Sequence, residues 1–395
     1  MTDFTMVVPT YWGRAGSESS RDDKIIFDHP TSLDENGTLA RFLESLHILN
    51  GSEELIIVII PVPNDPQITD AVVNKIEEIL TPFRPRYDIV CLHQYAIERI
   101  KEQLAERGVS REALDLINLT NYAAVRNMCS LAGILTGRNN TIFIDDDEVF
   151  TDLNFLKKIK ENMYSKVQDE YIHALAGYYL QPDTYRLETD KVPAWRAPHW
   201  NNAAAMNEAF DRFIGQGPRI KPTPFVFGGN MTLALSVLKK VPFDPRITRG
   251  EDIDFLINLR INGITFYLDR ELAIKHLPPG SSRPAWKGIR EDALRFLYER
   301  KKVTDHPNLT PDQLHPYPGL FLGADLEERI IKTNTLLQQE YESRGDEEGV
   351  RECEANIAIA EKNPFQSFDT VAWLGKLTAL WQELTAHAEG MGISE

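Results

Sequence analysis

Three adjacent carboxylates, Asp145, Asp146 and Asp147, directly follow an apolar segment that has the composition of a buried strand. Like charges within about 6 Å raise one another's pKa, so such a cluster persists where water solvates it or a cation neutralises it. Because side chains alternate along an extended chain, Asp145 and Asp147 point the same way and can face one divalent ion. Carboxylate oxygens favour Mg²⁺ or Mn²⁺ bound together with substrate phosphates. The alternative is a solvated acidic turn ahead of a helix near Leu153.

A second acidic group, Gly250-Glu251-Asp252, stands at the start of a helix expected over about residues 251–261. The helix dipole stabilises carboxylates there by about 0.3–1 kcal/mol, which alone would explain these acids. A carboxylate at this place can also act as a general base that deprotonates a nearby hydroxyl. Upstream, Gly228-Gly229-Asn230 gives a backbone with almost no side chains, which can approach a ligand closely or form an ordinary turn.

Two further groups could complete such a site. His276 follows a strand expected at 265–268; as a neutral imidazole it would be a third metal ligand and favour manganese, although a lone histidine is more often structural. Arg283, Lys287 and Arg290 come next, and in this acidic chain they either bind a diphosphate or form a solvated basic face.

Alternating strands and helices in the first 150 residues must position these groups. Strands are expected at 4–8, 55–60, 89–92 and 141–144, and helices at 39–46, 68–80 and 121–135, from the spacing of apolar residues. This alternation predicts right-handed crossovers and a mostly parallel α/β sheet, whose ligands bind beyond the carboxyl ends of the strands. Arg126, on the helix before the acidic strand, either covers the surface or reaches the same site.

After residue 150 the pattern loosens. Strands are expected at 172–180, 223–227 and 265–268, with a long polar stretch at 181–221. From about residue 325 the chain is expected to be purely helical, and its last helix carries an apolar stripe that would serve as core or as a homo-oligomer contact. The charged segment 11–38 is expected to be a loop that covers part of the site.

The overall charge limits the partners. Lys and Arg total 43 against 59 carboxylates, so the net charge is −16, which argues against binding of nucleic acid or of an anionic membrane. An anionic substrate would need a local counter-charge. The three cysteines match neither a disulfide nor a zinc pattern and are expected to be buried thiols. Residues 1–4 lack signal-peptide features and the longest apolar run is too short to span a bilayer, so a soluble cytoplasmic protein is expected.

Five short motifs together resemble the nucleotide-sugar glycosyltransferases of the GT-A fold, family 2 type. In chain order they are Val8-Pro9-Thr10-Tyr11, Arg126-Asn127, Asp145 to Asp147, Gly228-Gly229-Asn230 and Gly250-Glu251-Asp252. The resemblance covers about residues 4–280. It implies a Rossmann-like GT-A domain over 1–290, with a nucleotide-sugar part at about 1–150 and an acceptor part at about 151–290, followed by a helical C-terminal extension over 291–395.

The resemblance also implies roles for individual residues. Asp147, Asp145 and His276 would bind Mn²⁺ or Mg²⁺, and Asp252, with Glu251 beside it, would be the catalytic base. The residues expected to bind the nucleoside-diphosphate sugar are Pro9, Thr10, Tyr11, Arg14, Asp65, Arg126, Asp145, Asp146, Gly229, Asn230, Arg283 and Lys287. The implied reaction moves a sugar to the hydroxyl of a sugar or small-molecule acceptor, with inversion at the anomeric carbon. Trp195, His199, Trp200 and Asn201 lie where such enzymes place the acceptor, or they anchor a loop.

Other interpretations remain open on the sequence. A retaining GT-A transferase would use the same metal site. A phosphatase of the haloacid-dehalogenase type would use Asp145 as nucleophile with Lys239 or Lys240 beside it. A nucleotidyltransferase that makes sugar nucleotides and a non-catalytic sugar-binding protein are the remaining two.

Overall fold

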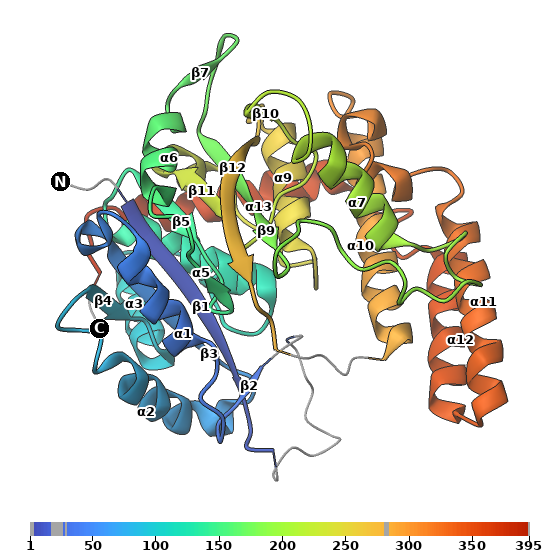
Figure 1. Cartoon of the computed structure of the whole chain (residues 1–395), viewed down its shortest axis with the longest axis horizontal. Coiled ribbons are helices and arrows are strands. Elements are labelled where there is room, and N and C mark those ends of the chain that lie inside the picture. Colours follow the sequence, from blue (N-terminus) through green and yellow to red (C-terminus); the bar gives the residue numbers. More distant parts are fainter. Residues whose placement is uncertain (1–3, 17–26, 28–29, 280–283, 394–395) are drawn as a thin grey trace.

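The computed structural model describes residues 4–16, 27, 30–279 and 284–393. A twisted ten-stranded sheet crosses the molecule, with helices packed against it and a helical C-terminal region at one end (Figure 1). The strand order along its main path is β10-β12-β9-β11-β5-β1-β3-β4. The predicted fold class, a mostly parallel α/β sheet flanked by helices with a helical C-terminal region, is confirmed.

The first half of the chain forms the parallel part of the sheet. Its strands are β1 (Phe4–Gly13), β3 (Ile56–Pro63), β4 (Asp88–Cys91) and β5 (Asn140–Phe143), and neighbours among them run parallel. Its helices are α1 (Leu39–Ser45), α2 (Thr69–Leu80), α3 (Gln94–Glu106), α4 (Arg111–Leu114) and α5 (Tyr122–Leu135). Every strand and helix expected in this half is present. The apolar run of β3 is buried because helices cover both faces of a parallel sheet.

Strand β1 is longer than expected. It continues past Val8 to Gly13 and pairs with β3 as far as Trp12. Strand β5 pairs with β1 only as far as Val7, and the short β2 (Thr31–Ser32) pairs with Trp12 and Gly13. Among the described strands, none pairs with this edge of β1 between Val7 and Trp12, at the carboxyl end of β5. The expected loop over 11–38 is in part strand; residues 17–26 and 28–29 lie outside the described residues.

The second half of the sheet mixes strand directions. It contains β6 (Glu148–Val149), β9 (Ala174–Leu180), β10 (Ile220–Pro222), β11 (Met231–Ala234) and β12 (Tyr267–His276), besides a separate hairpin of β7 (Lys166–Val167) and β8 (Glu170–Tyr171). Strand β11 runs antiparallel between β5 and β9, and β12 runs parallel to β9. The expected strand at 265–268 is wrong in length: β12 extends to His276. Its charged residues interrupt the apolar pattern, so the sequence alone underestimates it.

Two segments between residues 181 and 230 differ from expectation. The polar stretch holds a helix, α7 (Asn202–Phe213), which the Asn201 side chain caps and which buries Ala209 and Phe210. Residues 223–227, expected as a strand, are irregular. Phe225 and Phe227 are buried instead by packing on Phe210, with ring centroids 5.2 and 5.3 Å away.

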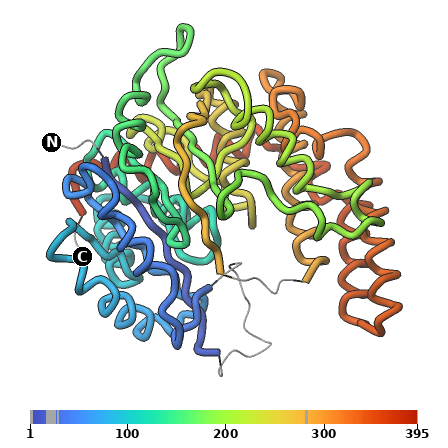
Figure 2. The backbone as a smooth tube through the Cα atoms, viewed as in Figure 1, coloured from blue at the N-terminus to red at the C-terminus, as the bar shows by residue number. Residues whose placement is uncertain are grey.

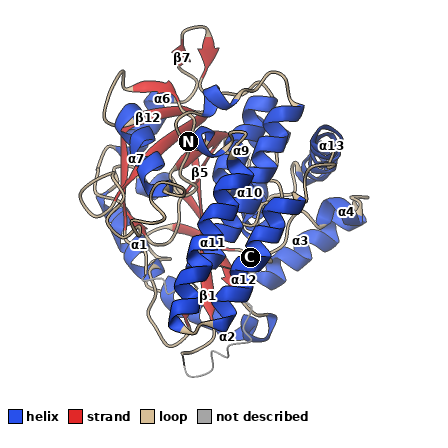
Figure 3. Cartoon of the chain, turned by 90° about the vertical axis from the view of Figure 1, so that its right-hand side faces the viewer, coloured by secondary structure: helices blue, strands red, loops and turns tan. Residues whose placement is uncertain are grey.

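The C-terminal region is helical, as expected over 291–395, and its helices begin at Ala285, before residue 325, the expected start of the purely helical part. After α6 (Phe155–Asn162), α8 (Leu235–Lys240) and α9 (Glu251–Ile261), the C-terminal helices are α10 (Ala285–Asp305), α11 (Leu326–Arg344), α12 (Glu347–Lys362) and α13 (Thr370–Ala388). Helices α10, α11 and α12 pack together (Figure 3). The expected domain boundary at residue 290 falls inside α10, whose inner face packs against the rest of the chain.

The last helix returns to the first half of the chain (Figure 2). The backbone N–H of Ser110 donates to the Glu383 carboxylate at 2.6 Å, and the Trp381 indole donates to the Leu238 carbonyl at 2.7 Å. The apolar stripe of α13, including Leu377 and Leu384, is therefore covered by the chain itself. In the part of the chain that the structure describes, no helix combines the length and the apolar character needed to cross a bilayer.

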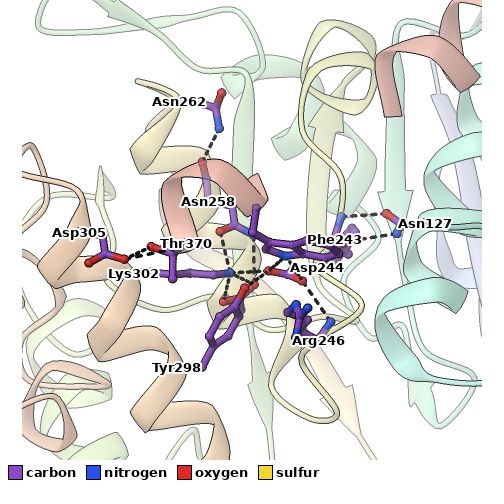
Figure 4. A network of polar contacts seen from close by, with 12 residues as sticks. Asn127, Phe243, Asp244, Arg246, Asn258, Asn262, Tyr298, Lys302, Asp305 and Thr370 are labelled. Atoms are coloured by element: carbon purple, nitrogen blue, oxygen red, sulfur yellow. Dashed lines mark hydrogen bonds and ion pairs between the residues drawn. The ribbon is translucent and has the colours of Figure 1, made fainter. Parts of the chain in front are cut away.

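A buried charge network joins α10 to α9 (Figure 4). The fully buried Lys302 ammonium contacts Asp254 at 2.7 Å and Asp244 at 2.9 Å. It also donates a hydrogen bond to the Asn258 side-chain oxygen at 3.0 Å. The Tyr298 hydroxyl donates to Asp244 at 2.7 Å. One cation thus balances two carboxylates away from water, and it fixes α10 against the helix that begins with Glu251 and Asp252.

We predict that Lys302→Met lowers the free energy of unfolding by about 3–5 kcal/mol, because it leaves two buried carboxylates without a counter-charge. The neighbouring Lys301, whose partner is the partly exposed Asp305, is the matched control. Lys301→Met should cost about 1 kcal/mol or less. Urea unfolding of both variants measures the difference, and equal losses would show that the network contributes no more than a surface pair.

Candidate active site

A pocket of about 270 Å³ lies at the carboxyl ends of β1 and β5. Residues 145–147 after β5, the start of α9 and the end of β12 all line this pocket. Its walls are formed by Tyr11, Thr38, Tyr122, Arg126, Asp145, Asp146, Asp147, Tyr179, Gly228, Arg249, Gly250, Glu251, Asp252, His276 and Pro279. The two acidic groups, more than 100 residues apart in the sequence, therefore meet in one place with the histidine that the sequence singles out.

Arg126 joins the two acidic groups. It projects from α5, which begins where the Asn121 side chain accepts a hydrogen bond from the Ala124 N–H. Two nitrogens of its guanidinium lie 2.9 and 3.1 Å from the Asp145 carboxylate, and its Nε donates to Glu251 at 3.2 Å. Only 5% of the Arg126 side chain is exposed, and the two carboxylates hold its pKa well above the ordinary value despite burial. Arg126 is thus a permanent buried cation between both carboxylates.

Asp146 has a different environment from its neighbours. Its carboxylate accepts a 2.6 Å hydrogen bond from the Thr10 hydroxyl on β1. Burial, with a contribution from the Asp147 charge, raises the Asp146 pKa to about 7. The hydrogen bond ties the acidic turn to β1, and it gives the fully buried Thr10, which is not among the residues that line the pocket, a structural role.

Asp147 and His276 form a close pair. The His276 Nε2 lies 3.3 Å from an Asp147 oxygen, and the Leu277 N–H donates to the Asp147 carbonyl at 2.9 Å. The imidazole stacks on Tyr179, with centroids 4.7 Å apart, and its Nδ1 lies 3.2 Å from the Gln181 amide. A glutamine amide can donate or accept, so it suits either imidazole tautomer. Ring and carboxylate are thereby held in one orientation.

The Asp147–His276 pair has an oxygen atom that is available to bind a metal ion. The Asp147 Oδ1 is buried and has no hydrogen-bond partner among the described residues. A carboxylate beside an imidazole is a donor set that suits Mn²⁺ or Mg²⁺ when substrate oxygens complete the shell. Within the described ranges, no three His, Cys, Asp or Glu side chains converge as a ready-made metal site. Asp145, expected as a further ligand, is paired with Arg126 instead.

Asp252 is held by backbone groups at the start of α9. Its two oxygens accept hydrogen bonds from the Gly228 N–H at 3.0 Å and the Ile253 N–H at 2.8 Å. Burial raises the Asp252 pKa above its ordinary value, although these donors and nearby arginines oppose the shift. Burial likewise raises the pKa of Glu251 to about 7. Asp252 is therefore oriented and desolvated, and its raised pKa makes it a stronger base than an exposed aspartate.

The two glycines at 228 and 229 allow the backbone to pass between the charged groups. A Cβ on Gly228 would lie 2.7 Å from an Arg126 nitrogen. A Cβ on Gly229 would lie 2.1 Å from the Glu148 carboxylate and 2.8 Å from Asp145. The expected close approach at these glycines is thus to the site's own side chains.

Glu148 and Tyr179 are site residues without an assigned role in the sequence analysis. Glu148 is fully buried, its Oε2 accepts from the Asp145 N–H at 3.3 Å, and burial raises its pKa well above the ordinary value. The Tyr179 hydroxyl accepts from the Gly229 N–H at 2.8 Å. The signal for Glu148 is its place directly after the acidic triplet, whereas Tyr179 stands at the end of an expected strand with no motif around it.

Several expected donor-binding residues lie outside the pocket walls. Arg14 and Asp65 pair with each other at 2.5 Å. The Asn230 amide donates to two backbone carbonyls, and Lys287 lies in the first turn of α10. Pro9 is buried in β1, and the Gly229 N–H is bonded to Tyr179. Arg283 falls outside the described residues.

Neither a protein-family model nor a curated protein sequence matches this chain. Among solved structures, a mannosyltransferase from Pyrobaculum calidifontis in complex with GDP-Man and Mn²⁺ is similar, with 12% identity and a TM-score of 0.48 over 98% of this chain and 86% of that one. A mycobacterial protein is 15% identical, with a TM-score of 0.40 over 76% of this chain and 74% of that one. Mouse xyloside xylosyltransferase 1 in its apo form is 12% identical, with a TM-score of 0.32 over 65% of this chain and 76% of that one. At identities this low, the roles of residues must come from the site itself.

We predict that Gly229→Ala destabilises the protein by about 1–3 kcal/mol, because the fully buried Glu148 cannot move away from the added methyl group. The control is Gly375→Ala on α13, where an added Cβ meets nothing within 4 Å. Alanine in a helix interior should there stabilise by about 0.5–1 kcal/mol. Chemical unfolding of both variants tests this, and a neutral Gly229→Ala would contradict the tight contact.

Proposed function

We propose that this protein is a glycosyltransferase that moves a sugar from a nucleoside-diphosphate sugar to an acceptor hydroxyl. One observation carries the proposal: a single pocket holds the Asp147–His276 pair and the desolvated Asp252, with the buried Arg126 between the acidic groups. The first arrangement suits a cation with a diphosphate, and the second suits removal of a proton from an alcohol. Glycosyl transfer from a sugar nucleotide needs both.

The diphosphate would be held at the Asp147–His276 end of the pocket. These two residues would bind Mn²⁺ or Mg²⁺ together with diphosphate oxygens. When bound, the ion supplies stabilisation of the negative charge that grows on the leaving nucleoside diphosphate. Arg126 keeps Asp145 neutralised, so the acidic turn presents fewer uncompensated charges to an anionic donor.

Asp252 would be the base for the acceptor. Its carboxylate would take the proton of the attacking hydroxyl while the Gly228 and Ile253 N–H groups hold it in place. A single displacement with this base inverts the anomeric carbon. Glu251, engaged with Arg126, would position the start of α9 rather than touch the acceptor. A retaining transferase with the same ion-binding pair is the second candidate, and the anomeric signal of the product by NMR separates the two.

The phosphatase interpretation is less well supported. Both oxygens of Asp145 face the Arg126 guanidinium, which lowers the nucleophilicity of that carboxylate. The lysines expected to assist it lie elsewhere: Lys239 pairs with Glu389, and Lys240 donates to the Asn262 carbonyl. No lysine is among the described residues that line the pocket.

We expect one nucleoside diphosphate to raise the melting temperature in the presence of Mn²⁺, and the shift to disappear when EDTA removes the ion. Asp147→Ala should abolish the metal-dependent shift, because it removes one of the two proposed protein ligands. Asp169→Ala, an exposed acid in the β7–β8 turn, is the control. A shift that persists without metal, or in Asp147→Ala, would contradict the proposed ion site.

Asp252→Asn should keep the nucleotide-dependent shift while lowering transfer by about 10²–10⁴-fold, since the amide cannot accept the proton. Release of nucleoside diphosphate, followed with a panel of acceptors, measures transfer. Because burial places the Asp252 pKa above its ordinary value, transfer by the unaltered protein should fall as the pH drops through that raised pKa. Unchanged turnover in Asp252→Asn would rule out this base.

A further inference from the structure

We propose that a second pocket, on the other side of Asp252, binds the acceptor as a neutral sugar ring. This inference rests on the proposed glycosyl transfer. The pocket has a volume of about 390 Å³ and shares Arg249, Gly250 and Asp252 with the first one. A pocket of about 300–1,000 Å³ is the usual size for a small-molecule site. Asp252 thus stands in a wall common to both pockets, where a base must stand between donor and acceptor.

One side of this second pocket is a rigid apolar wall. Phe210, Phe225 and Phe227 line it and are 1%, 2% and 9% exposed. Their rings lie 5.2–5.7 Å apart, so each fixes the others. Met206 of α7 adds a flexible apolar contact. A flat apolar surface of this kind suits the C–H face of a pyranose, while an acyclic polyol presents no such face.

The same pocket also offers hydrogen-bonding groups. The Asn202 amide donates to Asp292 at 2.5 Å, and the Asn202 Oδ1 is buried without a hydrogen-bond partner among the described residues. Arg295 donates to the Tyr317 hydroxyl at 2.6 Å and lies 3.2 Å from Asp292. A buried acceptor atom with no partner is costly, so it favours a ligand that brings a hydroxyl donor.

The charges in the pocket favour a neutral ligand. Arg295 is already compensated by Asp292, so it does not offer a full positive charge to a carboxylate or phosphate. Asp252 adds a negative charge beside the reacting position. An anionic acceptor would be repelled by this carboxylate, whereas a hydroxylated neutral ring uses the same groups as hydrogen-bond partners.

The pocket also leaves room for a substituent on the ring. A wider hollow of about 690 Å³ shares Leu187 and Ala203 with it. The tryptophans considered for acceptor binding take another role. Trp200 is buried against Phe296 and Phe321, and Trp195 donates to Glu340, so both anchor the loop before α7. The ligand class is therefore a glycoside rather than a compact free acid.

The test uses saturation-transfer NMR on the full chain with methyl glucoside, methyl mannoside and methyl galactoside as probes. We expect at least one of them to bind, and Met206→Trp, which fills the pocket, to weaken it by about tenfold or more. Glu208→Ala, on the exposed side of the same helix, is the matched control and should bind as the unaltered protein does. Asn202→Ala, which removes the unpartnered oxygen, gives a second variant if Met206→Trp does not fold.

The outcomes separate this inference from the proposed function. Binding that is unchanged in Met206→Trp and Asn202→Ala, or binding only of a hexose 6-phosphate or a short hydroxy acid, overturns the neutral-ring assignment. Nucleotide binding is measured on the same samples. Glycoside binding without any nucleotide binding would contradict glycosyl transfer but keep the pocket, and nucleotide binding without any glycoside binding would do the reverse.

Discussion

The site depends on one buried cation between two carboxylates that come from distant parts of the chain. Asp145 follows β5 and Glu251 begins α9, and the two lie on either side of Arg126 with 5% of its side chain exposed. Without that guanidinium, two acids would face each other in a poorly solvated pocket. Although the chain carries a net charge of −16, a single arginine on α5 neutralises these two carboxylates, and no basic cluster is needed.

Because Arg126 pairs with Asp145, each acidic residue of the triplet has a different partner. Asp145 is occupied by Arg126 and Asp146 by Thr10, so Asp147 is left to face His276. The backbone at Gly228 completes this arrangement, because its N–H holds Asp252 while its missing side chain makes room for Arg126. Residues that look alike in the sequence thus differ in their partners, and their chemistry follows from those partners.

The sequence predicts the elements whose signals are local. Helix α5 begins at the capping Asn121, and α9 begins at the acids after Gly250, as their positions indicate. That Asp147, His276 and Asp252 share a site is implied by the resemblance of the five motifs to GT-A glycosyltransferases, since Asp252 begins a helix and does not end a strand. The sequence misses the length of β12 and the irregular segment around Phe225, where pairing and aromatic packing between distant segments decide the structure. Tyr179 escapes prediction for the same reason, since it acts through contacts with distant residues, the stacked imidazole of His276 and the N–H of Gly229.

The C-terminal helices contribute directly to the electrostatics of the site. Arg295 of α10 lies so close to Gly250 that a Cβ there would meet its guanidinium at 2.0 Å, and its charge lowers the pKa of Asp252 against the effect of burial. Burial raises the pKa of the neighbouring Glu299 to about 8, so near neutral pH this group is mostly uncharged and does not cancel Arg295. The start of α9 is therefore held from both sides, by Arg126 in the first pocket and by Arg295 of α10 in the second. Because Arg295 also lines the second pocket, a change at this residue should alter the proton affinity of Asp252 and the wall of that pocket together.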